Sequence, residues 1–204
     1  NTASVLIVSL GCEGTDHERM VKEISATGKR VEIIHIQELG GVSKAIMAGT
    51  NIARRLVIEA SGMQRSPADI SNVVMAIKCG ASDTTSGMAS NCVIGYVADR
   101  LVDLGATVVF GETTEFIGGE HLLARRAVSK EVGDQIYTIV NKMEARAKSL
   151  GCDMRKGQPT PGNIAGGLSS IEEKSLGAIV KSGTKPIQGV LDYPERVTNQ
   201  KGLW

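Results

Sequence analysis

The chain has 204 residues, a formal net charge of +1 at pH 7, and 42% hydrophobic but only 3% aromatic residues. The balanced charge predicts no nucleic-acid partner and no binding to an anionic membrane, and so few aromatic side chains argue against a base-stacking surface. No apolar run approaches the roughly 20 residues that a membrane-spanning helix needs. We therefore expect neither nucleic acid nor membrane among its partners.

Strand-length apolar runs alternate with segments of helical periodicity over residues 1–150. The expected strands are residues 5–9, 31–36, 72–78 and 107–110. The expected helices are residues 16–27, 42–62, 91–104, 120–129 and 131–150. This alternation predicts an α/β fold, with a three-layer, mostly parallel sheet, helices on both faces and right-handed crossovers.

The character of the chain changes after residue 150. Residues 151–167 are rich in Gly and Pro and have no periodicity, which predicts a long irregular loop of functional importance. Ser169 or Ser170 is expected to cap a short helix that reaches about Val180, and residues 186–191 are expected to form a last strand. We assign residues 1–150 to an α/β domain with the site motifs, and 151–204 to a loop and C-terminal extension of the same domain.

The four cysteines contain no CxxC pair and match no small secreted disulfide framework. We therefore expect reduced thiols, a cytoplasmic location and no structural zinc site. The chain opens on Asn1 without a signal peptide, and we expect it to be the central part of a longer protein.

Three expected strands end in reactive side chains. Cys12 follows the first strand, Lys78 and Cys79 follow the third, and Glu112 follows the fourth. Ligands of open α/β sheets bind outside the carboxyl ends of the strands, so these residues predict one composite site. Cys12 has three open interpretations: a thiolate of lowered pKa, a metal ligand, or a small packed side chain.

Lys78 is unusual because a lysine at the end of an apolar strand needs a partner or a substrate. The Gly, Ser and Thr residues that follow it up to Gly87 are typical of a loop that binds an oxygen-rich ligand such as a carboxylate. The loop has neither a Walker nor a GxGxxG pattern, so we expect no NAD, and no PLP is expected either.

Three carboxylates and one imidazole lie between Glu112 and His121. They suit Fe, Mn or Zn as ligands, but Glu115 and Glu120 equally suit a helix N-terminus, with His121 on a helix surface. The sequence leaves both interpretations open.

Taken together, the motifs resemble the altronate/galactarate dehydratase family, which includes the large subunit of (2R)-sulfolactate sulfo-lyase. They occur in family order over nearly the whole chain: GCE at 11–13, KCGxSDxxSGxxxN at 78–91, ETxE at 112–115, GxEHLLxRRA at 118–127, PxPGNxxGGLxxxEEKSLGAxxKxGT at 159–184 and KGL at 201–203. The chain departs from the family pattern at four positions: Cys92, Thr114, Gln158 and Thr160. The presence of Thr114 in the ETxE motif favours the sulfolactate branch of the family over the sugar-acid dehydratases.

The resemblance implies a lyase that eliminates water or sulfite from a 2-hydroxy carboxylate and gives a 2-keto acid. It implies a divalent metal, Fe(II) or Mn(II), with an iron–sulfur cluster as an open alternative. The implied metal ligands are Cys12, Cys79, Glu112 and His121. The implied catalytic residues are Lys78, Asp83, Glu173 and Lys174, with Lys78 as a base if burial lowers its pKa. The implied substrate-binding residues are Ser82, Ser86, Asn163 and Gly166.

The implied partners are a small hydroxy acid, the remaining segments or a small subunit of the same enzyme, and further copies in a homo-oligomer. Two alternatives to a lyase remain. One is a hydrolase with Cys12 or Cys79 as its nucleophile, and the other is a non-catalytic subunit or assembly domain.

Overall fold

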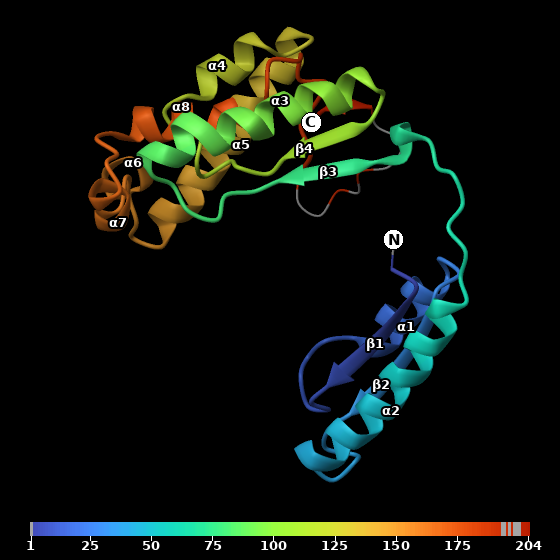
Figure 1. The fold of residues 1–204 in the computed structure, drawn as a ribbon. Coiled ribbons are helices and arrows are strands. Elements are labelled where there is room, and N and C mark those ends of the chain that lie inside the picture. Colours follow the sequence, from blue (N-terminus) through green and yellow to red (C-terminus); the bar gives the residue numbers. More distant parts are fainter. Residues whose placement is uncertain (1, 193–194, 196, 198–200) are drawn as a thin grey trace. The chain divides into compact units, whose positions relative to one another are not determined.

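The fold of the chain is described here from a computed structural model, which covers residues 2–192, 195, 197 and 201–204 (Figure 1). Two compact units share the chain, Asn1–Pro67 and Ala68–Trp204. Each has its own parallel sheet. No helix in the described part of the chain is both long and apolar enough to cross a membrane.

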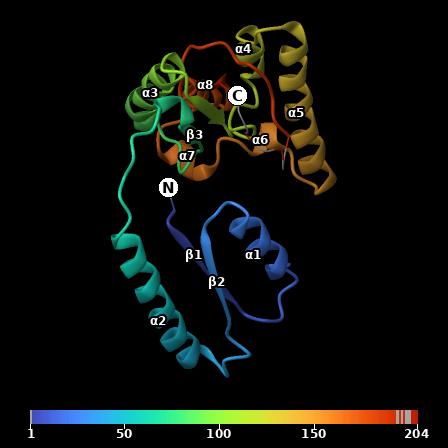
Figure 2. The same ribbon diagram turned by 90° about the vertical axis from the view of Figure 1, so that its right-hand side faces the viewer.

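The first unit is a ββ pair with two helices. Its elements are β1 (Ser4–Ser9), α1 (His17–Ser25), β2 (Arg30–His35) and α2 (Val42–Ser61). β1 and β2 are parallel and pair from Ser4↔Arg30 to Ser9↔His35. The helices α1 and α2 lie on opposite sides of this pair (Figure 2). Buried Ile34, Ala45 and Leu56 form its apolar interior.

The second unit has a three-stranded parallel sheet in the order β3-β4-β5. The strands are β3 (Val74–Ile77), β4 (Thr107–Phe110) and β5 (Gly202–Leu203). Isolated bridges join Leu203 to Ile187 and Ile187 to Ala127, which continues the hydrogen bonding beyond β5. The end of the chain therefore lies beside the central strand, and the C-terminal segment is an integral part of this sheet.

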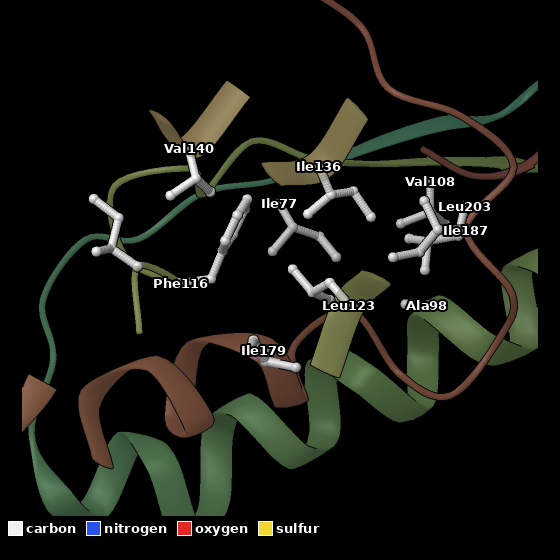
Figure 3. Close-up of a cluster of buried hydrophobic side chains, with 11 residues drawn as sticks. Ile77, Ala98, Val108, Phe116, Leu123, Ile136, Val140, Ile179, Ile187 and Leu203 are labelled. Carbon is white, nitrogen blue, oxygen red and sulfur yellow. The ribbon is translucent and has the colours of Figure 1, made fainter. Parts of the chain in front are cut away.

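Helices cover both faces of the second sheet (Figures 1 and 2). They are α3 (Asn91–Asp103), α4 (Glu120–Arg125), α5 (Lys130–Ser149), α6 (Met154–Gly157), α7 (Pro161–Ala165) and α8 (Ile171–Val180), with a 3₁₀ turn η1 (Ile70–Asn72) and a π-helical turn η2 (Ser86–Ser90). In Figure 3, Ile77 of β3 lies between Ile136 of α5 and Ile179 of α8. These residues belong to one buried apolar cluster with Val108, Phe116 and Leu203, and this core fixes the strand ends that carry the site.

The predicted α/β class with parallel strands and helices on the sheet faces is confirmed. The observed units divide the chain after Pro67, whereas the expected division fell at residue 150. The difference arises because residues after 150 pack on the same core as β3 and β4: Ile179, Ile187 and Leu203 all belong to it. The strands also form two sheets of two and three strands within these units.

Two local predictions after residue 150 were wrong. Residues 151–167 contain the short helices α6 and α7, because Asp153 and Thr160 cap their first turns and Pro161 occupies a position that suits proline. Residues 186–191 form no strand in the described structure and contribute only the two bridges of Ile187. The short strand β5 was not predicted, since two residues carry no periodicity.

Candidate active site at the strand ends

The carboxyl ends of β3 and β4 lie side by side. Ile77 pairs with Phe110 at the last register position, and the Gly111 N–H donates to the Ile77 carbonyl at 3.1 Å. Lys78 and the segment from Glu112 to Glu115 therefore emerge at the same edge of the sheet. The Lys78 ammonium donates to Glu115 Oε1 at 2.9 Å.

The Lys78–Glu115 pair is half open to solvent, with the Lys78 side chain 60% exposed and the Glu115 side chain 16% exposed. Partial burial opposes the charge on Lys78, but the hydrogen bond and the negative charge of Glu115 outweigh it and raise the pKa of Lys78. The expectation that burial lowers this pKa is therefore wrong. Lys78 is therefore held as a cation, and it can act as a base only after its ammonium has lost a proton.

Glu112 is fully buried at the end of β4. Its Oε2 accepts a 2.7 Å hydrogen bond from the ammonium of Lys181, while Oε1 has no hydrogen-bond partner among the described residues. Burial raises the pKa of Glu112, and the ion pair with Lys181 only partly opposes this effect. One carboxylate oxygen of Glu112, a predicted metal ligand, therefore already accepts a hydrogen bond from Lys181.

The loop after β3 contains several hydrogen bonds between its own residues. Asp83 Oδ1 accepts from the Ser86 N–H at 2.6 Å and from the Thr85 hydroxyl at 2.8 Å. These bonds, that of the Ser86 N–H first, lower the pKa of Asp83. The Cys79 thiol lies 3.3 Å from the Ser82 hydroxyl. Asp83 therefore organises the turn that leads into η2 and α3 as an anion.

The second loop, around α7, is attached to the first by backbone and amide contacts. The Asn163 side chain donates from Nδ2 to the Ser82 carbonyl at 2.9 Å, and the Thr84 N–H donates to the Gly166 carbonyl at 3.0 Å. A Cβ on Gly166 would lie 2.9 Å from the Asp83 Cβ, so the backbones approach too closely for a larger residue. The two loops, remote in sequence, therefore form one wall of the site.

Lys174 and Glu173 on α8 support this wall. The Lys174 ammonium donates to Asn163 Oδ1 at 3.1 Å and to the Gln158 side-chain oxygen. Glu173 Oε2 accepts from the N–H and the hydroxyl of Ser169 at 2.7 and 2.5 Å. The hydroxyl and then the N–H of Ser169 lower the pKa of Glu173, which makes its carboxylate a weak base.

A solvent-open cleft of about 300 Å³ lies against these residues. This volume is at the lower end of the range typical of small-molecule sites. Five of the predicted site residues line it: Ser82, Asp83, Ser86, Glu173 and Lys174. Asn91, whose Nδ2 donates to the Gly177 carbonyl at 2.7 Å, also lines the cleft and ties α3 to α8. The structure thus gathers the predicted loop and α8 residues around one concave surface.

The predicted metal ligands of the second unit do not gather in the same way. His121 is exposed on α4, and Glu112 is paired with Lys181. The fourth predicted ligand, Cys12, belongs to the first unit. Across the described residues, no three His, Cys, Asp or Glu side chains are grouped so that they can hold a metal ion. Within the second unit, Cys79, Glu112 and His121 therefore do not form a three-ligand site.

The turn of the first unit that carries Cys12 is closed by its own residues. Glu13 accepts from the N–H groups of Leu10 and Gly11 at 2.9 and 2.6 Å, and His17 Nε2 lies 3.1 Å from Glu13 Oε1. The exposed Cys12 thiol receives a 3.3 Å contact from Gln37 Nε2. Asp16 caps α1 by accepting from the Arg19 N–H.

Lys181 and Gln158 are contacts of the site that the sequence reasoning did not assign. The available signal for Lys181 was its position at the end of the apolar run Ala178–Ile179–Val180, which is the same pattern that singled out Lys78. Gln158 carried no comparable signal. Its role depends on Lys174, which is 16 residues away.

Both units match described protein families. Residues 70–204 match the family described as "D-galactarate/Altronate dehydratase, C-terminal". Residues 1–61 match the one described as "D-galactarate dehydratase/Altronate hydrolase, second domain". The gap between these matches contains the boundary between the two structural units at Pro67.

Curated relatives match over nearly all of the chain. The (2R)-sulfolactate sulfo-lyase subunit beta of Chromohalobacter salexigens is 41% identical and covers 100% of this chain, which spans 52% of that protein. The altronate dehydratase of Bacillus subtilis is 33% identical, and the match covers 100% of this chain and 40% of that protein. The galactarate dehydratase (L-threo-forming) of Escherichia coli is 34% identical, and the match covers 98% of this chain and 39% of that protein. The chain thus spans about half the length, or less, of these relatives.

Proposed function

Because this chain belongs to the D-galactarate/altronate dehydratase family, we propose that it forms part of a lyase that converts a 2-hydroxy carboxylate into a 2-keto acid. The relatives that support this proposal are named as two dehydratases and a sulfo-lyase. In such an elimination, a base removes the proton on the carbon next to the carboxylate. The group on the next carbon departs with its bonding electrons, and the resulting enol becomes the keto acid.

The observation that carries the proposal is the Lys78 ammonium at the strand-end edge, at the start of a loop whose residues Ser82, Asp83 and Ser86 line the cleft. The proton next to a carboxylate is very weakly acidic, so the reaction needs positive charge where negative charge develops. Lys78 supplies this charge, and Ser82 and Ser86 offer hydroxyl groups to the oxygens of the substrate. Lys78 can act as the base only after its ammonium has given a proton to Glu115 or to water, which leaves a neutral amine.

Dependence on Fe(II) or Mn(II) stays a prediction for the full-length enzyme. Within the second unit, Cys79, Glu112 and His121 form no three-ligand site, so the roles proposed here for Lys78, Ser82 and Ser86 are binding and proton transfer. To bind a metal, Glu112 would have to exchange its hydrogen bond from Lys181 for the metal or use Oε1, which has no hydrogen-bond partner among the described residues.

Within the family, we favour elimination of sulfite from sulfolactate. The support is the higher identity to the sulfo-lyase subunit, 41% against 33% and 34% for the two dehydratases, together with the Thr114 departure. That relative is named as a subunit, so we also propose that this protein acts with a second type of subunit. The four free cysteines support a reducing, cytoplasmic setting.

The experiment is a keto-acid release assay on the full-length protein, purified without oxygen and supplied with altronate, galactarate or sulfolactate. Its metal content is measured on the same sample. Lys78→Met is expected to lower kcat by at least about 100-fold, the usual contribution of a positioned acid or base. Lys130→Met removes an exposed lysine of α5, paired at 2.7 Å with Asp134, and should leave kcat unchanged.

Each alternative predicts a different result. If Lys78→Met retains full activity, Lys78 has no part in the reaction. If none of the three acids is converted and alkylation of Cys12 or Cys79 blocks a hydrolytic activity, the protein is a thiol hydrolase. If activity appears only when a partner subunit is added, and Lys78→Met does not change it, this protein is a non-catalytic subunit.

A further inference from the structure

Lys181 is a buried lysine with no role in the reaction proposed above. Its ammonium pairs with Glu112 Oε2 at 2.7 Å, and the two side chains are 6% and 0% exposed. Burying both charges costs solvation free energy. The attraction between them offsets this cost only when their geometry is well fixed. A pair of this kind is weak evidence for stability, and it suggests that the geometry itself is what matters here.

The turn that carries Lys181 is held from two sides. Lys181 is the C-cap of α8, where a positive charge suits the helix end. Arg126 donates from Nη1 to the Ser182 hydroxyl at 2.8 Å and from Nη2 to the Lys185 carbonyl at 2.8 Å. Asp99 Oδ1 accepts from the Thr184 N–H at 2.7 Å. The ammonium of Lys181 is thus presented to Glu112 from a turn with little freedom.

Glu112 connects this turn to the pair at the strand end. Its carbonyl accepts from the N–H groups of Glu115 and Phe116 at 2.9 and 3.1 Å, which closes the turn that follows β4. The same turn presents the Glu115 carboxylate to the Lys78 ammonium. A displacement of Glu112 therefore moves the acceptor that holds Lys78.

We propose that Lys181 is a positioning residue, which anchors Glu112 and thereby sets the geometry of the Lys78–Glu115 pair. The consequence for catalysis rests on the proposed function, because it requires that Lys78 acts on the substrate. Under this inference, loss of Lys181 lowers kcat and leaves KM nearly unchanged, since the cleft residues Ser82 and Ser86 do not contact Lys181.

The test measures the Lys78–Glu115 geometry without using activity. A water-soluble carbodiimide joins a lysine and a carboxylate in direct contact as an amide: it activates the carboxyl group, the lysine nitrogen attacks, and the carbodiimide leaves as a urea. The yield of the Lys78–Glu115 cross-link in the full-length protein is quantified by mass spectrometry. It is normalised to the Lys130–Asp134 cross-link, whose atoms are 2.7 Å apart on α5.

Lys181→Met is expected to lower the normalised yield at least threefold. The matched control is Lys185→Met, which removes a lysine of the same turn that pairs with Asp103 at the surface and should give the parental yield. A folded Lys181→Met protein with the parental yield would overturn the inference.

Lys181→Met leaves Glu112 buried without its partner, and the protein can then fail to fold. The double variant Glu112→Gln/Lys181→Met removes both charges with little change of shape, and it is expected to fold. Its cross-link yield should also be at least threefold low, and the parental yield in this variant would overturn the inference. If the parental protein has no lyase activity but the variants still lower the cross-link yield, the positioning role holds and the proposed function is refuted. If the parental protein is an active lyase but the variants keep the parental yield, only the positioning role is refuted.

Discussion

Two cysteine-bearing turns follow parallel strands in this chain, and they differ in how much they depend on remote segments. The turn after β1 is closed mainly by residues within four positions of Glu13, namely Leu10, Gly11 and His17. The turn after β3 has local bonds as well, such as those of Asp83 to Thr85 and Ser86. In addition, it is held by partners far away in the sequence: Lys78 contacts Glu115 37 positions later, and Ser82 contacts Asn163 81 positions later. The same sequence pattern of an apolar strand and a cysteine therefore leads to a local turn in one unit and to an assembled site in the other.

The comparison indicates where the chemistry is expected. A turn that satisfies its own hydrogen bonds keeps its shape independently of the rest of the fold, and its polar groups are already used. A turn held by remote segments depends on the complete core of its unit, and it brings groups from several elements to one cleft. The second turn is therefore the one whose function should be sensitive to distant substitutions.

The largest expected effect on stability comes from a glycine where the two loops touch. Gly167 has φ +96°, and a Cβ there would lie 2.4 Å from the Thr84 hydroxyl oxygen. Gly167→Ala should destabilise the second unit by about 2 kcal/mol or more, since the left-handed backbone and the overlap each cost roughly 1–2 kcal/mol. Urea unfolding of the full-length protein measures this, and keto-acid release should fall at least about tenfold.

The matched control for that substitution is Gly28→Ala. Gly28 has a similar φ of +78°, and a Cβ there would meet nothing within 4 Å. Only the backbone cost of about 1–2 kcal/mol should appear, with unchanged activity. Equal losses in the two variants would mean that the contact between the loops contributes nothing.

A smaller effect is expected at Asn163, which joins the loops and whose side chain completes the capping box of α7 with Thr160. Asn163→Ala should cost about 1–2 kcal/mol through the lost cap and the lost bond to Ser82, and it should reduce kcat/KM about tenfold. Ser129→Ala removes the cap of α5, where Ser129 accepts from the Val132 N–H, and costs a similar amount. Steady-state kinetics on both variants distinguish the two: similar activity in both would show that the loop contact has no part in the site.

The smallest effect tests the local turn. Its backbone N–H groups, that of Glu13 itself first and those of Gly11 and Leu10 after it, lower the pKa of Glu13 from 4.5 to about 2. Because the folded pKa lies below the unfolded one, the stabilisation is complete above about pH 4.5 and is lost as the pH falls towards 2. Carboxyl NMR should therefore place the Glu13 midpoint near 2.

Glu13→Gln provides the second measurement on this turn. In thermal unfolding, it should flatten the pH dependence between about 4.5 and 2 and leave the lyase assay unchanged. Glu18→Gln, on the exposed side of α1, should keep the parental slope. A Glu13 midpoint near 4.5 would show that its backbone contacts are not formed in solution.

Much of the secondary structure was predictable because it is encoded within single segments. The four longer strands and the helices α2, α3, α5 and α8 were expected within a few residues of their observed bounds. Their apolar periodicity and their caps, such as Ser170 at α8, are local signals. The candidate site was predictable to the extent that its residues follow strand ends or lie in the loops, as Lys78, Asp83 and Asn163 do.

The sequence by itself determined the α/β class, the family and the segments that carry reactive groups, because hydrophobic periodicity and motif order are properties of neighbouring residues. Only the tertiary structure decided which groups meet. It paired Lys78 with Glu115 and Glu112 with Lys181, and it left His121 exposed on α4. It also placed β5 beside β4 and divided the chain after Pro67. These outcomes depend on contacts between segments 37 to 95 positions apart, and the free energy of such contacts comes from the packed core as a whole.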